Sequence, residues 1–442
     1  MAKLELSDAL TRADGYSHAV VSFVDADGYP NSVAAEFRTD AARTALELGP
    51  LATEVLPAEG ADVCVTFSHI RPQSGIGYDE RRYINLWGPA QVSGDRVTIV
   101  AERATGWDEA EVPFFEYAER GVPLAQDYLE EVDGDQRPHL SKWWTFFLAT
   151  RLPFLTATIV PIALGGAVAG ADGGFALGWW LLALVAGCAV HLGLNIANDI
   201  FDDASGADAA NVTPTPFSGG SRVIQYGLVS RKGMVRACVA FYAVAIVIGL
   251  FLAAERGWWL LAIGAVGVAL SLAYTAPPFR LVHRGLGEPV TALGFGPVMT
   301  LGAYFVCAQQ WSWEAFYISL PVALLIALVL YVNQIPDLAG DEAAGKRTLI
   351  VRWSETRVIT AYEIMAGAAF VLIALGPALG ITPWWTLVAL LTVPMALKVV
   401  RGLRASYGQP YALMPVMQTN IGLHLFTGLL LIVGYLIDVV VS

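Results

Sequence analysis

The sequence predicts an all-α bundle of nine membrane-spanning helices, preceded by a small soluble domain built mainly from β-strands. Hydrophobic residues make up 55% of the chain, charged residues make up 15%, and the mean hydropathy is +0.54, values typical of a membrane protein. Charge is also uneven: residues 1–141 carry 25 acidic and 11 basic side chains, whereas residues 142–442 carry 14 and 16. An acidic, soluble-looking segment is therefore joined to a large apolar body.

Residues 1–130 are predicted to form the soluble domain. HAVVSFVDADGYPNSVAAEF contains two β-rich runs around DADG, which is a turn signal, and ADVCVTFSH, RRYINLWGPAQV and DRVTIVAERA add further strands. PFFEYAERGVPLAQDYLEE is typical of a helix. We expect a small β-barrel or sandwich that ends in a helix, then a linker over residues 131–142, and a membrane domain over residues 143–442.

Nine apolar stretches in the second part are each about long enough to cross a bilayer as a helix, and β-sheet is not a realistic alternative for such runs in lipid. If the N-terminus is cytoplasmic, 15 of the 16 basic residues of this part fall on the inner side, and only Arg256 lies outside. We therefore expect a multi-pass protein of the cytoplasmic membrane, with its C-terminus outside. The stretches lie near residues 145–170, 174–200, 232–253, 257–275, 287–309, 313–335, 357–378, 382–400 and 418–440.

Composition also excludes several classes of protein. The net charge of −12 argues against a nucleic-acid partner. The first residues, MAKLELSDALTRADGYSH, contain no apolar segment of a signal peptide, so we expect the first domain to stay in the cytoplasm. The cysteines are far apart and predict neither disulfides nor structural zinc; they are Cys64, Cys188, Cys238 and Cys307.

The first acidic motif, NIANDIFDDASGAD (195–208), follows directly on the second apolar stretch. In a helix, Asn195, Asn198, Asp199 and Asp202 stand at i, i+3, i+4 and i+7, which places them on one face. Carboxylates next to a lipid-facing segment are costly, so a run of them indicates function more than chance.

A second acidic motif, YVNQIPDLAGDEAAGKRTL, ends the sixth apolar stretch and contains Asn333, Asp337 and Asp341, each four residues apart. Both motifs follow helices that run from outside to inside, so both are expected at the cytoplasmic face, across one cavity. Mg²⁺ prefers such oxygen ligands and usually bridges carboxylates to substrate phosphates. Basic and Gly-rich segments, FSGGSR and AGKR, stand beside the motifs and complete a predicted diphosphate clamp. Helix capping is the alternative, and it is assigned to Asp203, Arg256 and Glu314.

These motifs, together with YTAPPFRLVHRGLGE (274–288), resemble the UbiA superfamily of intramembrane prenyltransferases over about 300 residues, and most closely the 1,4-dihydroxy-2-naphthoate prenyltransferases of menaquinone synthesis. The resemblance implies a nine-helix bundle with a cytoplasmic site, where Mg²⁺ binds a polyprenyl diphosphate. It implies metal ligation by Asn198, Asp202, Asp208, Asp337 and Asp341, and diphosphate binding by Arg222, Lys346, Arg347, Asn195 and Asn333.

Two positions depart from the superfamily pattern. Many members place a second Asp of the first motif where this chain has Gly206, and the later carboxylate here is Asp208, as in the naphthoate-type branch. Pro336 precedes Asp337 where many naphthoate enzymes carry Arg. The acceptor therefore stays open among dihydroxynaphthoate, homogentisate, a hydroxybenzoate and a glycerol-phosphate lipid.

The chemistry assigns further roles near the motifs. Tyr274 offers an aromatic face to an allylic cation, although a tyrosine of the interfacial belt fits the same position. Asp199 is a candidate proton acceptor. His191 lies one turn before Asn195 and is assigned to packing, and Glu288 to helix capping. A transporter with a soluble regulatory domain is the alternative of another class, disfavoured because the polar residues stand at helix ends instead of the midplane.

The first domain resembles the flavin-binding split barrels of the pyridoxamine-phosphate-oxidase type, through VVSFVDADGYPNSVAAEF and YINLWGPAQV. Arg71, Arg81 and Arg82 are available, but they do not form a matched phosphate-binding pattern. Two alternatives follow: a barrel that binds flavin, or a degenerate barrel without flavin that forms a homodimer or docks on the membrane domain. The second is favoured.

Overall fold

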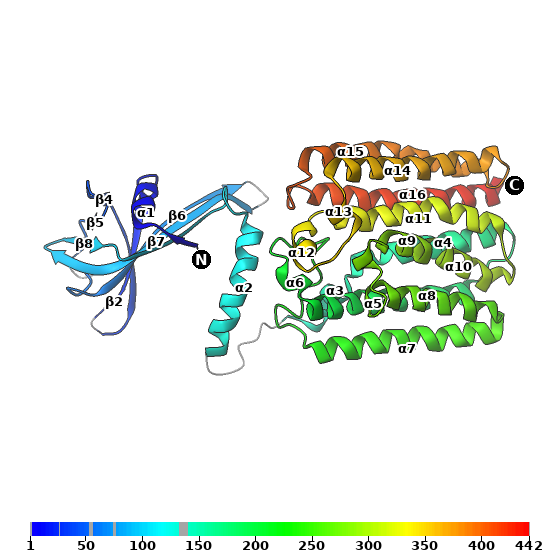
Figure 1. The fold of residues 1–442 in the computed structure, drawn as a ribbon, viewed down its shortest axis with the longest axis horizontal. Helices are drawn as coiled ribbons and strands as arrows, with labels where there is room; N and C mark the ends of the chain where they lie inside the picture. The colour runs from blue at the N-terminus through cyan, green and yellow to red at the C-terminus, as the bar shows by residue number, and fades with distance from the viewer. Residues whose placement is uncertain (1, 26, 53–55, 74–76, 132–139, 442) are drawn as a thin grey trace. The chain divides into compact units, whose positions relative to one another are not determined.

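The computed structural model describes residues 2–25, 27–52, 56–73, 77–131 and 140–441 (Figure 1). The chain divides into two compact units, Met1–Tyr128 and Leu129–Ser442, and each is considered separately below. Most of the predicted linker, residues 132–139, lies outside the described residues. The exact domain boundaries at residues 130 and 142 stay a prediction.

The first unit is an antiparallel sheet with two helices, α1 (Leu6–Ala13) and α2 (Phe114–Glu131). Its strands follow the order β3-β2-β6-β7-β8-β5-β4, and β9 pairs with both β7 and β1. The predicted turn at Gly94–Asp95 joins β7 to β8, and the predicted DADG turn falls between β2 and β3, with its Ala26 outside the described residues. The strands are β1 (Ala2–Leu4), β2 (Ala19–Val24), β3 (Pro30–Ala35), β4 (Phe37–Thr39), β5 (Ala45–Leu48), β6 (Asp62–Gln73), β7 (Gly77–Ser93), β8 (Arg96–Val100) and β9 (Arg103–Asp108).

Strand β7 organises this sheet, because it pairs with β6 and β9 along its first part and with β8 from Ala90 onward. Gly88 stands where the partner changes, and a Cβ there would lie only 1.9 Å from the carbonyl oxygen of Val100, so the crossing requires a glycine. The inward faces of the strands and α1 enclose one apolar core around Leu10, Phe67 and Leu86. A β-rich domain is confirmed, whereas its barrel type stays a prediction.

The second unit is a bundle of long apolar helices (Figure 1). Within the described residues, eight helices are long and apolar enough to cross a membrane, and Trp259–Thr275 is a shorter apolar helix of 17 residues. The helical membrane fold is therefore confirmed, and the count of nine spans is taken up below. The main helices are α4 (Thr156–Ala171), α5 (Leu177–Ser205), α7 (Arg231–Arg256), α8 (Trp259–Thr275), α9 (Gly287–Leu293), α10 (Met299–Ala308), α11 (Trp313–Asn333), α14 (Glu355–Ala378), α15 (Val393–Ser406) and α16 (Met414–Val441).

Helix α11 lies at the centre of this bundle. It packs against α4, α9, α10, α14 and α16, and 78% of its most apolar window is buried, the largest share of the eight candidate spans. Figure 1 shows α14, α15 and α16 on one side of α11, and α7 and α8 on the other. Because α11 is enclosed, the acidic motif that follows it begins deep inside the unit.

The first predicted span is divided, which sequence periodicity did not reveal. Instead of one helix near residues 145–170, α3 (Lys142–Thr150) ends at Arg151, whose φ of +51° breaks the helix. The next span runs over Leu152–Ala171 and starts with a short 3-10 turn, Leu152–Leu155, which contains Pro153. The left-handed conformation at a non-glycine residue is a costly one, and the buried ion pair that Arg151 makes there, described below, offsets that cost.

Candidate functional site

The first acidic motif lies at the end of α5. This helix ends at Gly206, which takes the left-handed conformation with φ of +77°, and the four-residue helix α6 (Ala207–Ala210) follows at once. The turn places Asp208, on α6, beside the face of α5 that carries Asn198 and Asp202. A glycine is favoured at this position because a side chain would strain the left-handed backbone.

The second motif lies on both sides of a break in the chain. Helix α11 ends at Asn333, Pro336 follows, and α12 (Leu338–Ala343) begins with Asp337 as its N-cap and Asp341 in its first turn. A proline cannot continue the hydrogen bonding of α11, so it redirects the backbone. Asp341 is then followed by Lys346, whose main-chain N–H donates to the carbonyl oxygen of Asp341 at 2.8 Å.

The two motifs meet through buried side chains. The Nζ atom of Lys346 lies 3.0 Å from Oδ2 of Asp202 and 3.2 Å from Oδ1 of Asp341, so one ammonium joins a carboxylate of each motif. On the opposite side, the Nδ2 group of Asn211 donates to Oδ1 of Asp337 at 2.8 Å. The main-chain N–H of Gly219 donates to the other oxygen, at 3.1 Å.

The backbones of the two motifs also approach closely. A Cβ at Gly340 would lie 3.0 Å from Cβ and 3.1 Å from Cα of Asn211, so α12 packs against the residue that follows α6 without room for a methyl group. A Cβ at Gly220, whose φ is +78°, would lie 2.8 Å from Oδ1 of Asp208. Both glycines therefore allow the motifs and the FSGGSR loop to converge.

A cavity of about 180 Å³ lies between the motifs. The predicted site residues that line it are Tyr274 and eight residues of the two motifs: Asn195, Asn198, Asp202, Asp208, Asn333, Asp337, Asp341 and Lys346. The structure therefore brings together most of the residues that the sequence singled out, although they are more than a hundred positions apart in the chain.

Burial and, after it, neighbouring negative charge raise the pKa of two carboxyl groups outside the membrane spans. Burial, followed by the charges of Asp202 and Asp199, raises the pKa of Asp208 to about 8. Burial and the charge of Asp341 raise the pKa of Asp337 to about 7, although hydrogen bonds from Gly219 and Asn211 act in the opposite direction. Negative charge is concentrated here beyond what Lys346 balances, which favours a further cation.

The donor set fits a hard cation that arrives together with an anionic ligand. Among the described residues, no group of three or more His, Cys, Asp or Glu side chains is spaced to hold a metal ion alone. The Oδ1 atoms of Asp202 and Asn333 are nevertheless buried without a hydrogen-bond partner. Carboxylate and amide oxygens with free lone pairs suit Mg²⁺, which takes one or two carboxylates and completes its shell with water and phosphate oxygens.

Three predicted residues hold the site together instead of lining the cavity. Asp199 accepts a hydrogen bond from Nη2 of Arg151 at 2.6 Å, and its Oδ1 also accepts from the N–H of Ser221. Arg222 is buried, and its Nη1 group donates to the carbonyl oxygen of Asp208. Arg347 is exposed, and its main-chain N–H donates to the carbonyl oxygen of His283 at 2.9 Å.

Three further residues of the site were missed as functional by sequence reasoning. Arg151 lines the cavity, and His283 lies with Nε2 at 3.7 Å from Oδ1 of Asp202. Asn211 stands on the cavity wall and holds Asp337. His283 belongs to the quoted motif YTAPPFRLVHRGLGE, and Asn211 lies three residues after Asp208, so closeness to the motifs was the available signal.

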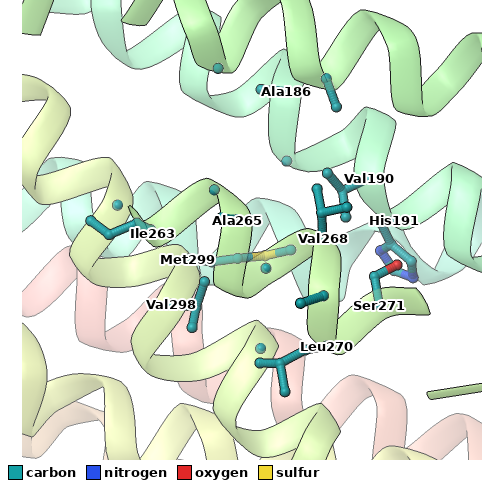
Figure 2. A pocket seen from close by; sticks show the side chains of 18 of the residues that line it. Ala186, Val190, His191, Ile263, Ala265, Val268, Leu270, Ser271, Val298 and Met299 are labelled. Carbon is teal, nitrogen blue, oxygen red and sulfur yellow. The ribbon is translucent and has the colours of Figure 1, made fainter. Parts of the chain in front are cut away.

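An apolar cavity of about 560 Å³ adjoins the polar one. Its walls come from α5, α7, α8, α9 and α10, and Figure 2 shows mainly small and aliphatic side chains around it, such as Ala186, Val268 and Val298. The two cavities share five wall residues, which are His191, Leu194, Tyr274, Thr291 and Phe295. A charged compartment and an apolar compartment therefore meet at a wall whose five residues include no Asp, Glu, Lys or Arg.

Known proteins resemble the membrane unit of this chain. A 2-carboxy-1,4-naphthoquinone phytyltransferase of Synechocystis is 29% identical over 301 residues, which cover 67% of this chain and 94% of that protein. A 1,4-dihydroxy-2-naphthoate octaprenyltransferase of Bacillus subtilis is 26% identical over 289 residues, covering 65% and 91%. A solved UbiA homologue of Archaeoglobus fulgidus, bound to GPP and Mg²⁺, has a TM-score of 0.47 and 13% identity, covering 65% and 99%.

The family comparison covers more than half of the chain. Residues 159–419 match the description of the UbiA prenyltransferase family, and this range contains both acidic motifs and nearly all of the helices around the two cavities. On this match, the chain belongs to the UbiA prenyltransferase family.

Proposed function

We propose that this protein transfers a polyprenyl group from an allylic polyprenyl diphosphate to an aromatic acceptor, in a reaction that requires Mg²⁺. The observation that carries the proposal is the pair of joined cavities, one lined by carboxylates and a lysine and the other apolar. A polyprenyl diphosphate has the same division, with an anionic head and a hydrocarbon tail. Its C1 atom would then lie at the shared wall.

The polar cavity would hold the leaving group. Mg²⁺ would be held by oxygen atoms of Asn198, Asp202, Asp208, Asp337 and Asp341. A bound Mg²⁺ would supply positive charge to offset the negative charge that develops on the leaving diphosphate. The ammonium of Lys346 stands beside Asp202 and Asp341 and can turn one of its three N–H groups to a phosphate oxygen. Asn195 and Asn333 offer neutral contacts from the same wall. Arg222 positions α6 through its bond to Asp208.

The apolar cavity would hold the prenyl chain and exclude water from the allylic carbon. Tyr274 and Phe295 present aromatic rings at the wall between the cavities, and a ring face stabilises a nearby cation. Water that reached this carbon would give a prenyl alcohol instead of the transfer product. The reaction therefore requires that water is excluded from this wall.

We propose 1,4-dihydroxy-2-naphthoate as the acceptor. The names of the relatives support a naphthalene-type ring, since one acts on 1,4-dihydroxy-2-naphthoate and the other is named for 2-carboxy-1,4-naphthoquinone. Homogentisate, a hydroxybenzoate and a glycerol-phosphate lipid are the competing acceptors. We also propose that Trp259–Thr275 completes a nine-span bundle in the cytoplasmic membrane, with the N-terminus and the site on the cytoplasmic side.

The test is a reconstituted assay with purified full-length protein, Mg²⁺, a polyprenyl diphosphate and each acceptor in turn, with products identified by mass. Prenylated naphthoquinol and free diphosphate are expected, and both should disappear when EDTA is added. The variant Asp202→Asn should lose turnover, whereas Asp203→Asn is the matched control, since Asp203 contacts Gln225 and Arg231 outside the cavity.

Two results would overturn the proposal. Full turnover in Asp202→Asn would remove the role of the first motif. Absence of any prenylated product with all four acceptors, together with substrate uptake by proteoliposomes, would favour the transporter instead.

A further inference from the structure

His191 is the one titratable side chain on the wall that the two cavities share, apart from the phenol of Tyr274. It lies on α5, one turn before Asn195, and only 5% of its surface is exposed. Figure 2 shows His191 and Ser271 as the labelled polar side chains of the otherwise apolar cavity. The packing role expected from sequence does not explain why a histidine stands there.

One of the two ring nitrogens of His191 has a hydrogen-bond partner. Its Nδ1 atom lies 2.8 Å from the hydroxyl oxygen of Thr158 on α4, which is completely buried. The ring also contacts Phe295 edge-on, with 4.7 Å between the ring centroids. Within the described part of the chain, Nε2 has no protein hydrogen-bond partner. This atom is not fully enclosed by protein, so a ligand in the cavity can reach it. A fixed ring with one unpaired nitrogen on a cavity wall is the arrangement of a general base.

The backbone beside Phe295 supports a functional wall. Gly294–Val298 forms a π-helical turn between α9 and α10, and this turn contains Pro297. Such turns insert an extra residue into a helix and occur frequently at functional sites. Here the turn brings Phe295 to the shared wall, against His191.

We propose that the acceptor ring binds at this shared wall and that Nε2 of His191 is the base that removes a proton from a ring hydroxyl. The inference rests on the proposed prenyl transfer and deepens it, because it names the acceptor subsite and the proton acceptor. The ligand class is a flat, hydroxylated aromatic ring, which suits a wall of aromatic and aliphatic side chains with the hydroxyl groups of Thr291 and Tyr274.

The ring carbon next to the hydroxyl forms a bond to C1 of the prenyl chain, the C1–O bond breaks, and its electron pair leaves with the diphosphate. The hydroxyl proton passes to Nε2, and the ring oxygen becomes a carbonyl. The attacked carbon then gives its proton to the departing diphosphate, or loses its carboxylate as CO₂, while the ring oxygen recovers a proton from His191 and the ring becomes aromatic again.

The sequence alone indicated Asp199, and not His191, as the candidate proton acceptor. Asp199 is paired with Arg151 at 2.6 Å and does not line either cavity, so the structure offers it no path to an acceptor hydroxyl. Arg151 and Asp199 instead act as a positioning pair. His191 lines both cavities, and it is the better placed of the two bases.

The experiment compares His191→Gln with His424→Gln in the full-length protein. His424 is the matched control, since it is also a buried histidine of the bundle but lines neither cavity. We expect His191→Gln to lower kcat about 100-fold, the lower range for loss of a general base, while KM for the prenyl diphosphate changes less than about threefold. His424→Gln should keep the wild-type kcat.

A second variant separates chemistry from folding. His191→Ala leaves space for a free base, so added imidazole should restore part of the lost turnover, whereas it should not help Asp202→Asn. Wild-type kcat in His191→Gln, or an equal loss in His191→Ala with and without imidazole, would overturn the inference and leave prenyl transfer intact. A wild-type protein without transfer activity would instead overturn the proposed function.

Discussion

The two acidic motifs differ in how their carboxylates are held, and the difference shows how each one depends on the other. Asp202 of the first motif lies beside the ammonium of Lys346, at 3.0 Å, and the imidazole of His283, at 3.7 Å. Asp337 of the second motif accepts hydrogen bonds from two neutral groups, the amide of Asn211 and the main-chain N–H of Gly219. Lys346, which pairs with Asp202 of the first motif, follows the second motif in the sequence. Asn211, whose amide donates to Asp337 of the second motif, follows the first motif. Neither motif is complete alone.

This exchange also explains where the negative charge stays unbalanced. Lys346 bridges Asp202 and Asp341, and burial raises the pKa of Asp341 as well as those of Asp208 and Asp337, the last two to about 8 and about 7. The carboxylates without a cation of their own should therefore be the ones most in need of a metal ion.

Asp337→Asn should have the largest effect. The amide keeps the size of the carboxylate but removes its charge, so a fall in kcat of about 10²–10³-fold is expected, as for other losses of an electrostatic contact at a reacting anion. Steady-state assays over a range of Mg²⁺ concentrations measure this. Turnover within a few-fold of wild type at saturating Mg²⁺ would contradict the role of the second motif.

Lys346→Gln should separate structure from catalysis. Loss of the ammonium leaves two buried carboxylates unpaired, so the variant should be less stable by about 3 kcal/mol without metal. Mg²⁺ should then restore more stability than it gives the wild type, while kcat stays low. Thermal unfolding with and without Mg²⁺ measures the difference, and Lys398→Gln, on α15, is the control. An equal response to Mg²⁺ in both proteins would mean that lysine and metal do not share these carboxylates.

Mg²⁺ binding should depend on pH. Burial raises the pKa of Asp208 to about 8 and of Asp337 to about 7, so both are partly protonated at neutral pH, and a metal must displace those protons. Affinity should therefore rise between about pH 6 and pH 8, with proton release on binding. Titration calorimetry in two buffers of different ionisation heat measures the release. Constant affinity over this range would show that these carboxyls do not bind the metal.

Gly340→Ala tests the contact between the motifs with a single methyl group. The new Cβ would lie 3.0 Å from Cβ of Asn211, so α12 must shift by a few tenths of an ångström. We expect a fall in kcat of about 3- to 10-fold, since small displacements of binding groups reduce rates. Gly367→Ala on α14 is the control, because its Cβ would meet nothing within 4 Å. Equal activity in both variants would contradict the tight packing of α12 on Asn211.

The sequence predicted the parts of the site that follow from local patterns. Apolar length located the spans, and clustered Asn and Asp residues identified both motifs, because charged groups are rare next to such helices. The conformation of Arg151 was not predicted, since a positive φ at a non-glycine residue leaves no compositional sign. The bridging position of Lys346 and the contact of Asn211 with Asp337 depend on how distant segments pack, which no local pattern contains.

The first unit was predicted less fully for a related reason. Its hairpins follow from turn residues, but the path of β7 between its partner strands depends on tertiary packing around Gly88. Two of the candidate flavin-binding side chains have other partners, since Arg71 pairs with Asp79 and Arg81 with Glu109. A barrel without flavin that forms a homodimer or docks on the membrane domain stays the favoured prediction for this unit.

The central claim is that both motifs bind one metal and one diphosphate, and a double-mutant cycle tests it most directly. The cycle measures Mg²⁺-dependent binding of a non-hydrolysable prenyl diphosphate to wild type, Asp202→Asn, Asp337→Asn and the double variant. If the motifs share the ligand, the double variant should bind no more than about threefold more weakly than the weaker single variant, which is strong non-additivity. Losses that simply add would show two independent sites and contradict the account.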